Sequence, residues 1–267
     1  MLLAAARDQG EALALWERAM DRVEQALRVS WREGLRAMRG EALALGRVPL
    51  RLPAQRVPVV SLAGEIFVRH DPLSRQGLIE RLAAHGLAVR TAPVSEWVFY
   101  TDWLQNQGIT RKAGLGGRVR QWFKRRVFAQ VMEAFAPSGL TRVHAAPTDH
   151  LIRAAAPYVS PMLTGEAVLT VGGAFHDILA PACGVVAIGP FGCMPTRVAE
   201  AVLAKRFDTQ TLAGIHPERV RGLPPHAHGK LPLLCVETDG NPYPQLIEAR
   251  LEAFCLQALR LHEAMAG

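Results

Sequence analysis

The chain has 267 residues, of which 49% are hydrophobic and 21% are charged. This length and composition allow a sizeable buried core and exclude a disordered chain, and no apolar run reaches the roughly 20 residues of a membrane-spanning helix. The formal net charge of +7 arises in one segment, residues 103–132, which holds seven basic residues and no acidic one. The rest of the chain is balanced, with 24 basic and 24 acidic residues.

The opening segment and the cysteines indicate where the protein resides. Asp8 and Glu11 interrupt the first residues, which lack the basic start and long apolar run of a secretory signal. Four cysteines without a CxxC pair argue against a disulfide scaffold. We therefore expect a cytoplasmic protein.

The first part of the chain is predicted to be helical. From residue 1 to about residue 45, large apolar residues such as Leu13, Trp16, Met20 and Leu27 recur at helical spacing with charges between them. One or two amphipathic helices follow from this pattern. A linker that contains three prolines is expected between residues 49 and 58.

The remaining sequence alternates predicted strands and helices. The predicted strands are four apolar runs: 57–63, 87–91, 184–189 and 231–237. The predicted helices are 77–85, a helix capped by Ser95, 117–135, 164–179, a helix after Pro195 capped by Thr196, and 244–263. Strands that are apolar throughout indicate parallel sheets with helices on both faces. We expect a Rossmann-like α/β fold, with a helical segment at 1–50, a first Rossmann-like unit at 51–140 and a second at 141–267.

Three loops that follow predicted strands are candidate ligand sites. They are residues 64–69, 189–195 and 238–242. In open parallel sheets, ligands bind beyond the carboxyl ends of the strands. Each loop combines a glycine, which lets the backbone approach a ligand closely, with a charged or reactive side chain, namely Glu65, Cys193 or Asp239. Glu65 and Asp239 are candidates for an acid and base pair, or each stabilises its own loop.

Cys193 is the sharpest single candidate. It precedes a predicted helix, whose positive end favours the thiolate that ligates metals or attacks electrophiles. The alternative is a turn cysteine held between Gly192 and Pro195. Cys183 lies before the predicted strand 184–189, and Cys193 lies after it. Along an extended chain the two are about 16 Å apart, which is too far for a shared metal ion. Cys235 and Cys255 are predicted to be core residues.

The basic segment is predicted to be an amphipathic helix. Its basic residues are Arg111, Lys112, Arg118, Arg120, Lys124, Arg125 and Arg126. A solvated helix face, a phosphate-rich ligand, an acidic partner and nucleic acid are the alternatives, with nucleic acid ranked last because no nucleic-acid-binding module is present. The sequence has neither a GxxxxGK[ST] nor a GxSxG motif, which argues against nucleotide hydrolysis and serine-hydrolase chemistry.

Five blocks resemble a known family. They are VVSLAGEIFVRHDPLSRQGLIERLAAHG, APVSEWVFYT, GEAVLTVGGAFHDI, VVAIGPFGCMPTRVAEAVL and LLCVETDGNPYPQLIEARLEAF. Across residues 57–254 the chain resembles the carboxyl-terminal part of the iron-sulfur proteins related to the D-component of 2-hydroxyglutaryl-CoA dehydratase, a group that includes the CoA-substrate-specific enzyme activases. GEIFVR and PFGCMP are the most specific blocks.

The resemblance implies an iron-sulfur cluster, of the 4Fe-4S type, held between Rossmann-like domains. In relatives, an ATP-hydrolysing activator supplies an electron for the radical dehydration of a 2-hydroxyacyl-CoA. The resemblance marks Cys193 as a cluster ligand. It places Gly64, Glu65 and Arg69 in the same cleft, together with Gly192, Asp239 and Gly240.

The family has an amino-terminal half with further cysteines, which this chain lacks. We therefore expect a cysteine-rich partner subunit or a missing amino-terminal half to supply the other ligands. The leading hypothesis is an iron-sulfur-associated component of a dehydratase-like (lyase) or ATP-dependent reductase system. The alternative is a non-catalytic binding or assembly subunit that has lost, or never held, the cluster.

Overall fold

The computed structural model describes residues 1–140, 147–241 and 245–266, and its contacts divide the chain into two compact units. The helical unit comprises Met1–Val57 and Gln105–His144. The α/β unit comprises Pro58–Leu104 and Ala145–Gly267. Part of the helical unit is therefore inserted between the two segments of the α/β unit.

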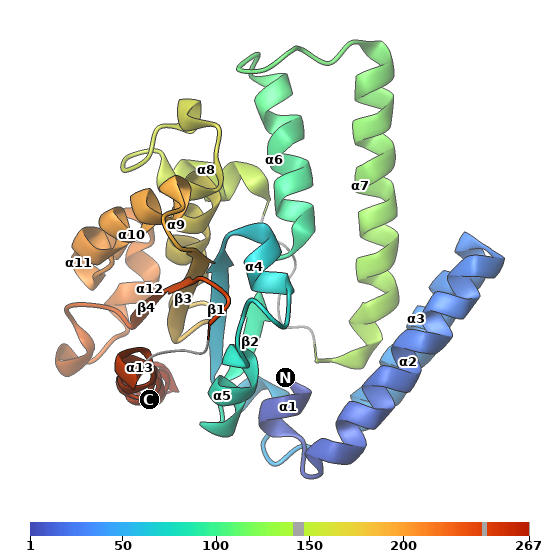
Figure 1. The fold of residues 1–267 in the computed structure, drawn as a ribbon, viewed down its shortest axis with the longest axis horizontal. Coiled ribbons are helices and arrows are strands. Elements are labelled where there is room, and N and C mark those ends of the chain that lie inside the picture. Colours follow the sequence, from blue (N-terminus) through green and yellow to red (C-terminus); the bar gives the residue numbers. More distant parts are fainter. Residues whose placement is uncertain (141–146, 242–244, 267) are drawn as a thin grey trace. The chain divides into compact units, whose positions relative to one another are not determined.

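A single sheet of four parallel strands forms the centre of the α/β unit (Figure 1). The strands are β1 (Val59–Gly64), β2 (Ala88–Thr91), β3 (Gly184–Pro190) and β4 (Leu233–Thr238), and they lie in the order β2-β1-β3-β4. In the register of the sheet, Val60 of β1 lies opposite Val89 of β2 and Gly184 of β3. The parallel α/β architecture expected from the apolar strands is confirmed, and it is Rossmann-like.

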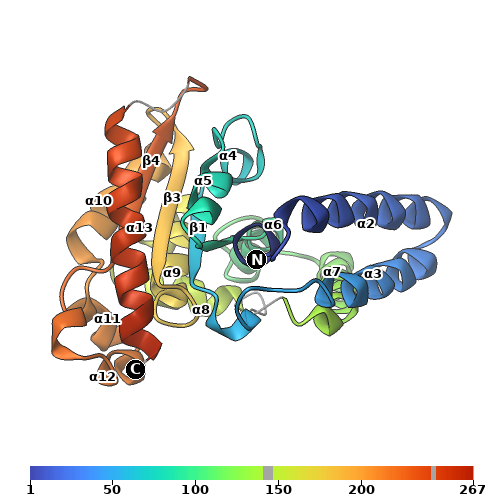
Figure 2. The same cartoon turned by 90° about the horizontal axis from the view of Figure 1, so that it is seen from below.

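Helices cover both faces of this sheet (Figures 1 and 2). On one face lie α5 (Leu78–Ala84) and α13 (Gln245–Ala266), joined by an ion pair of 2.6 Å between Arg81 and Glu248. On the other face, α9 (Glu166–Asp177) and α10 (Met194–Arg206) pack against each other and against the strands. The further helices of this unit are α4 (Ile66–His70), most of α6 (Val94–Asn106), α8 (Thr148–Ala155), α11 (Thr209–Ile215) and α12 (Pro217–Arg221), with short 3-10 turns η3 (Pro161–Leu163) and η4 (Pro225–Ala227).

The helical unit is built on a helical hairpin (Figure 2). Its elements are α1 (Leu2–Ala5), α2 (Gln9–Val29), α3 (Trp31–Gly46), η1 (Ala54–Arg56), α7 (Leu115–Phe135) and η2 (Ala136–Ser138). Asp8 and Ser30 cap α2 and α3 by accepting backbone N–H bonds. A small core joins Val23, Met38 and Ala134 from the three long helices. The helices expected in the first 45 residues are confirmed.

The division of the chain differs from the expected boundaries. Residues 51–140 and 141–267 each contribute two strands to one sheet, because β1 pairs with β2 on one side and with β3 on the other. Among the described residues they therefore form one sheet instead of two. Among the described residues, no helix combines the length and apolar character needed to cross a membrane.

Two expected helix caps are wrong. α6 begins at Val94, so Ser95 lies inside the helix, and its hydroxyl forms no hydrogen bond in the described structure. α10 begins at Met194, with Cys193 at the N-cap position. Pro195 occupies the first turn of α10, where a missing N–H costs nothing, so the helix starts before Thr196 instead of after the proline.

Candidate functional site

The three sequence-predicted loops meet at one edge of the sheet. β1, β3 and β4 are parallel neighbours, so their carboxyl ends lie side by side. Backbone hydrogen bonds join the loops: Glu65 N–H donates to Ile188 O at 2.8 Å, and Phe191 N–H donates to Thr238 O at 2.9 Å. This edge is called the carboxyl edge below. Pro242, the last residue of the third predicted loop, lies outside the described residues.

The strand order places a topological switch point between β1 and β3. From β1 the chain continues to β2 on one side of the sheet, whereas from β3 it continues to β4 on the other. In open α/β sheets, ligands bind in the crevice at such a point, outside the carboxyl ends of the strands. Glu65 and Cys193 follow β1 and β3 respectively, so both belong to this position.

Gly64 is required for the close approach of β1 to β3. Its φ is +110°, and a Cβ added there would lie 1.9 Å from Ile188 O. Only glycine satisfies both conditions without displacement of backbone. Gly192 and Gly240 also have positive φ values of +71° and +88°, but an added Cβ would meet nothing within 4 Å at either position. These two glycines shape their turns only.

Glu65 and Arg69 hold the first loop in place. Glu65 Oε2 accepts the Val68 N–H at 2.7 Å and caps α4. Arg69 is 4% exposed, and its guanidinium donates to Gly64 O and to Ala92 O. Asp239 acts similarly in the third loop, since its carboxylate accepts the N–H and side-chain amide of Asn241. Each of these charged groups has a structural role in its own loop.

Cys193 is half-buried and lies at the N-cap position of α10. Its side chain makes no capping bond at the start of α10. Burial raises the pKa of Cys183 and of Cys235 to about 12, and that of Cys255 to about 11. Cys183 and Cys255 are buried, and Cys235 is partly exposed within β4. Cys183 precedes β3 and Cys193 follows it, as expected.

The α/β unit contains a set of buried charges that the sequence did not predict. Glu96, in the first turn of α6, is buried; this burial, with the negative charge of Asp177, raises its pKa to about 7, while Arg69 and Arg90 oppose the shift. Arg90 Nη1 lies 2.6 Å from Asp177 Oδ1, an ion pair without hydrogen-bond geometry. Arg90 was the one signal of these buried charges in the sequence. It is a basic residue within a short predicted strand, and a buried charge needs a partner of opposite charge.

Asp177 is held ionised by its neighbours. Burial by itself raises the pKa of this carboxyl. The hydrogen bonds from His176 and Ser61, together with the charge of Arg90, outweigh burial, so the pKa lies below its ordinary value. Glu166, at the start of α9, behaves differently: burial and the nearby Glu65 raise its pKa, although it accepts the Ile66 N–H at 3.0 Å.

Elements near the carboxyl edge carry large exposed apolar side chains. Phe67, Met162, Phe191 and Met194 come from α4, η3, the loop after β3 and the start of α10, and each is between 60% and 78% exposed. Contacts bring these elements together, because α9 packs on both η3 and α10, and Glu166 bonds to the start of α4. We call this set the apolar rim. Exposed clusters of this kind mark interaction sites.

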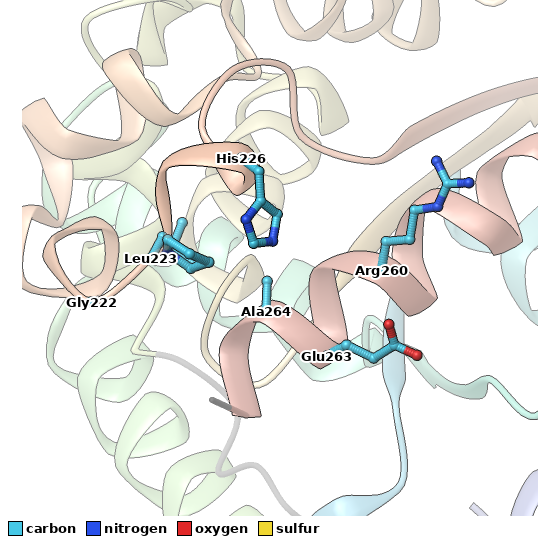
Figure 3. Close-up of a pocket in the computed structure, with 7 residues that line it drawn as sticks. Gly222, Leu223, His226, Arg260, Glu263 and Ala264 are labelled. Atoms are coloured by element: carbon cyan, nitrogen blue, oxygen red, sulfur yellow. The ribbon is translucent and has the colours of Figure 1, made fainter.

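A pocket of about 540 Å³ lies away from this edge (Figure 3). Its lining residues are Gly222, Leu223, Pro224, His226, Arg260, Glu263 and Ala264. It lies between the segment after α12 and the last turns of α13, and it includes none of the predicted site residues. The carboxyl edge therefore remains the candidate site.

The carboxyl edge does not hold a complete metal site. Within residues 1–140, 147–241 and 245–266, no three His, Cys, Asp or Glu residues are grouped so that they could hold a metal ion. An iron-sulfur cluster is usually held by four cysteine thiolates. Cys193 therefore fits one ligand position of a cluster that is completed elsewhere, and the described residues do not fit a cluster held by this chain alone.

Comparison of the chain with protein-family models, curated proteins and solved structures gave no match. The fold and site define a Rossmann-like α/β protein with a helical unit and an apolar-rimmed switch point.

Proposed function

We propose that the carboxyl edge is a docking surface at which this chain completes a cofactor site together with a second protein. The observation that carries this proposal is the apolar rim: four large side chains are exposed on four elements near the edge that also carries the half-buried Cys193. Covering them would remove apolar area from water and exclude water from Cys193.

The proposed cofactor is an iron-sulfur cluster of the 4Fe-4S type, and the proposed partner is a cysteine-rich subunit or amino-terminal half. The family resemblance of the GEIFVR and PFGCMP blocks supports both choices. Such a cluster would supply low-potential electron transfer in a 2-hydroxyacyl-CoA dehydratase-like or CoA-activase-like system that includes an ATP-dependent activator. Cys193 would contribute one thiolate, and the rim would keep the site dry. Four free cysteines fit a reducing cytoplasm.

The test is anaerobic reconstitution with iron and sulfide, with and without the co-expressed cysteine-rich partner. We expect the complex, but not this chain alone, to bind iron and sulfide. Cys193→Ala is expected to reduce the iron content of the complex, whereas the matched control Cys255→Ala leaves it unchanged because Cys255 is a buried helix residue. Unchanged iron content in Cys193→Ala would refute the ligand assignment.

A second candidate is a non-catalytic binding or assembly subunit. The apolar rim supports it equally, because a docking surface needs no metal ligand. In this case Phe191→Glu would abolish co-purification with the partner, and the wild-type complex would contain no iron. The two candidates share the docking surface and differ in the iron content of the complex.

A further inference from the structure

The first half of α7 carries an uncovered apolar face. Leu115, Val119, Trp122 and Phe123 are between 59% and 82% exposed. Residues spaced by four, seven and eight positions lie on one side of a helix. The second half of α7 packs within the helical unit by a different side, through Val131, Ala134 and Phe135. The exposed face is thus directed away from the core of its own unit.

A second uncovered stripe runs along α2. Leu13, Trp16, Met20 and Leu27 are 38–42% exposed and lie on one side of the helix, by their spacing of three, four and seven. This stripe borders the side of α2 that carries the buried residues Ala12, Ala19 and Val23. It extends about 21 Å along the helix, which is long enough to receive a helix face of two to three turns.

Charges of opposite sign flank the two faces. On α7, Arg118 and Arg125 lie seven positions apart, each three or four positions from Leu115 or Trp122. Neither arginine has an ion-pair partner among the described residues. They are called the arginine pair below.

On α2, Glu17 and Glu24 are also seven positions apart, each three or four positions from a residue of the stripe. They are called the glutamate pair below. Glu17 has no partner among the described residues, and Glu24 meets Arg28 only in an exposed pair at 2.7 Å, which contributes little energy. Two faces with matching seven-residue charge spacing resemble the flanking positions of a coiled-coil interface.

We propose that the helical unit forms a two-fold dimer in which α2 of each copy packs against the first half of α7 of a second copy. One chain carries both complementary faces, so two copies can bind each other through two equivalent contacts, as in a two-fold interface. A two-fold dimer contains the α2–α7 contact twice, so it buries twice the area of a single contact. This brings the interface closer to the roughly 1,200 Å² that stable interfaces bury. An anionic membrane is a poorer fit, because it would attract α7 but repel the glutamate pair.

The full-length chain tests this proposal in sedimentation velocity over a range of protein concentrations. We expect a dimer for the wild type. Reversal of the arginine pair (Arg118→Glu with Arg125→Glu) or of the glutamate pair (Glu17→Arg with Glu24→Arg) should raise the dissociation constant at least about tenfold, because like charges then face each other. The variant with all four substitutions should recover dimerisation, because its charges are again complementary.

A matched control carries Arg221→Glu and Arg260→Glu, two exposed arginines of the α/β unit, and should dimerise like the wild type. A wild-type chain that stays monomeric at every concentration would overturn the proposal. So would a fourfold variant that stays dissociated. A monomer that binds phosphatidylserine vesicles through the arginine pair would assign this face to a membrane instead. Cys193→Ala should leave dimerisation unchanged, so the iron-sulfur proposal and the dimer proposal fail independently.

Discussion

Ser61, in the middle of β1, donates a hydrogen bond of 2.5 Å to Asp177, at the end of α9, across 116 positions of sequence. The bond joins the central strand to a helix of the covering layer. His176 and Arg90 contact the second oxygen of the same carboxylate. This buried carboxylate therefore links three elements that are distant in the chain.

We predict that Asp177→Asn lowers the free energy of unfolding by about 3 kcal/mol, because it removes the ion-pair partner of the mostly buried Arg90 guanidinium. Urea unfolding measures this change. Ser61→Ala removes only a hydrogen-bond donor and should cost about 1–2 kcal/mol. Equal and small effects of the two substitutions would contradict a role of the charge.

The pH dependence of stability should reveal Glu96. Its pKa in the folded chain is raised to about 7, above the ordinary value, so its protonated form favours folding. This contribution is full below about pH 4.5 and is lost as the pH rises through about 7, with a limiting slope of about 1.4 kcal/mol per pH unit. Glu96→Gln, which stays neutral, should gain stability relative to the wild type as the pH increases. A difference between the two that does not vary with pH would rule this out.

Gly64 and Gly86 provide a matched comparison. Both have positive φ, but an added Cβ meets the backbone of Ile188 only at Gly64. Gly64→Ala should destabilise the chain by at least about 3 kcal/mol, whereas Gly86→Ala should cost about 1 kcal/mol from its backbone conformation alone. Thermal unfolding compares the two. Similar melting temperatures for the variants would show that β1 and β3 are not so closely packed at this point.

Alkylation should distinguish Cys193 from the other thiols. Burial raises the pKa values of Cys183, Cys235 and Cys255, which suppresses their thiolate forms. Under native conditions, iodoacetamide should modify Cys193 at least about tenfold faster than any of these three, as measured by peptide mass spectrometry. Modification of all four thiols at equal rates would refute the assigned burial. Unfolding in urea before alkylation provides the control.

The strands were predictable because the sheet is covered on both faces. Val59, Val60 and Leu62 are all buried, so β1 appears in the sequence as a continuous apolar run instead of an alternating one. Which strands pair could not be read in the same way. β1 pairs with β3 through a register set by packing across the whole sheet, and no local pattern encodes a partner so far along the chain.

The loops of the candidate site were also predictable, but the roles of their charges were not. Ligands bind beyond the carboxyl ends of parallel strands, and this rule placed Glu65 and Cys193 together without any knowledge of contacts. That Glu65 caps α4, and that Glu96 is buried, depend on which side chains lie within hydrogen-bonding or charge-interaction range after folding. Tertiary packing alone determines those distances.

The central position of β1 has a consequence for biosynthesis. The backbone N–H and thiol of Cys183 bond to Val59 O across 124 positions, and one segment of the helical unit is translated between them. At about 5–20 residues per second, a ribosome needs roughly 6–25 s for that stretch. During this time β1 has an apolar strand edge without its partner β3. We therefore expect newly made chains to be prone to aggregate or to recruit chaperones in the interval between synthesis of β2 and of β3.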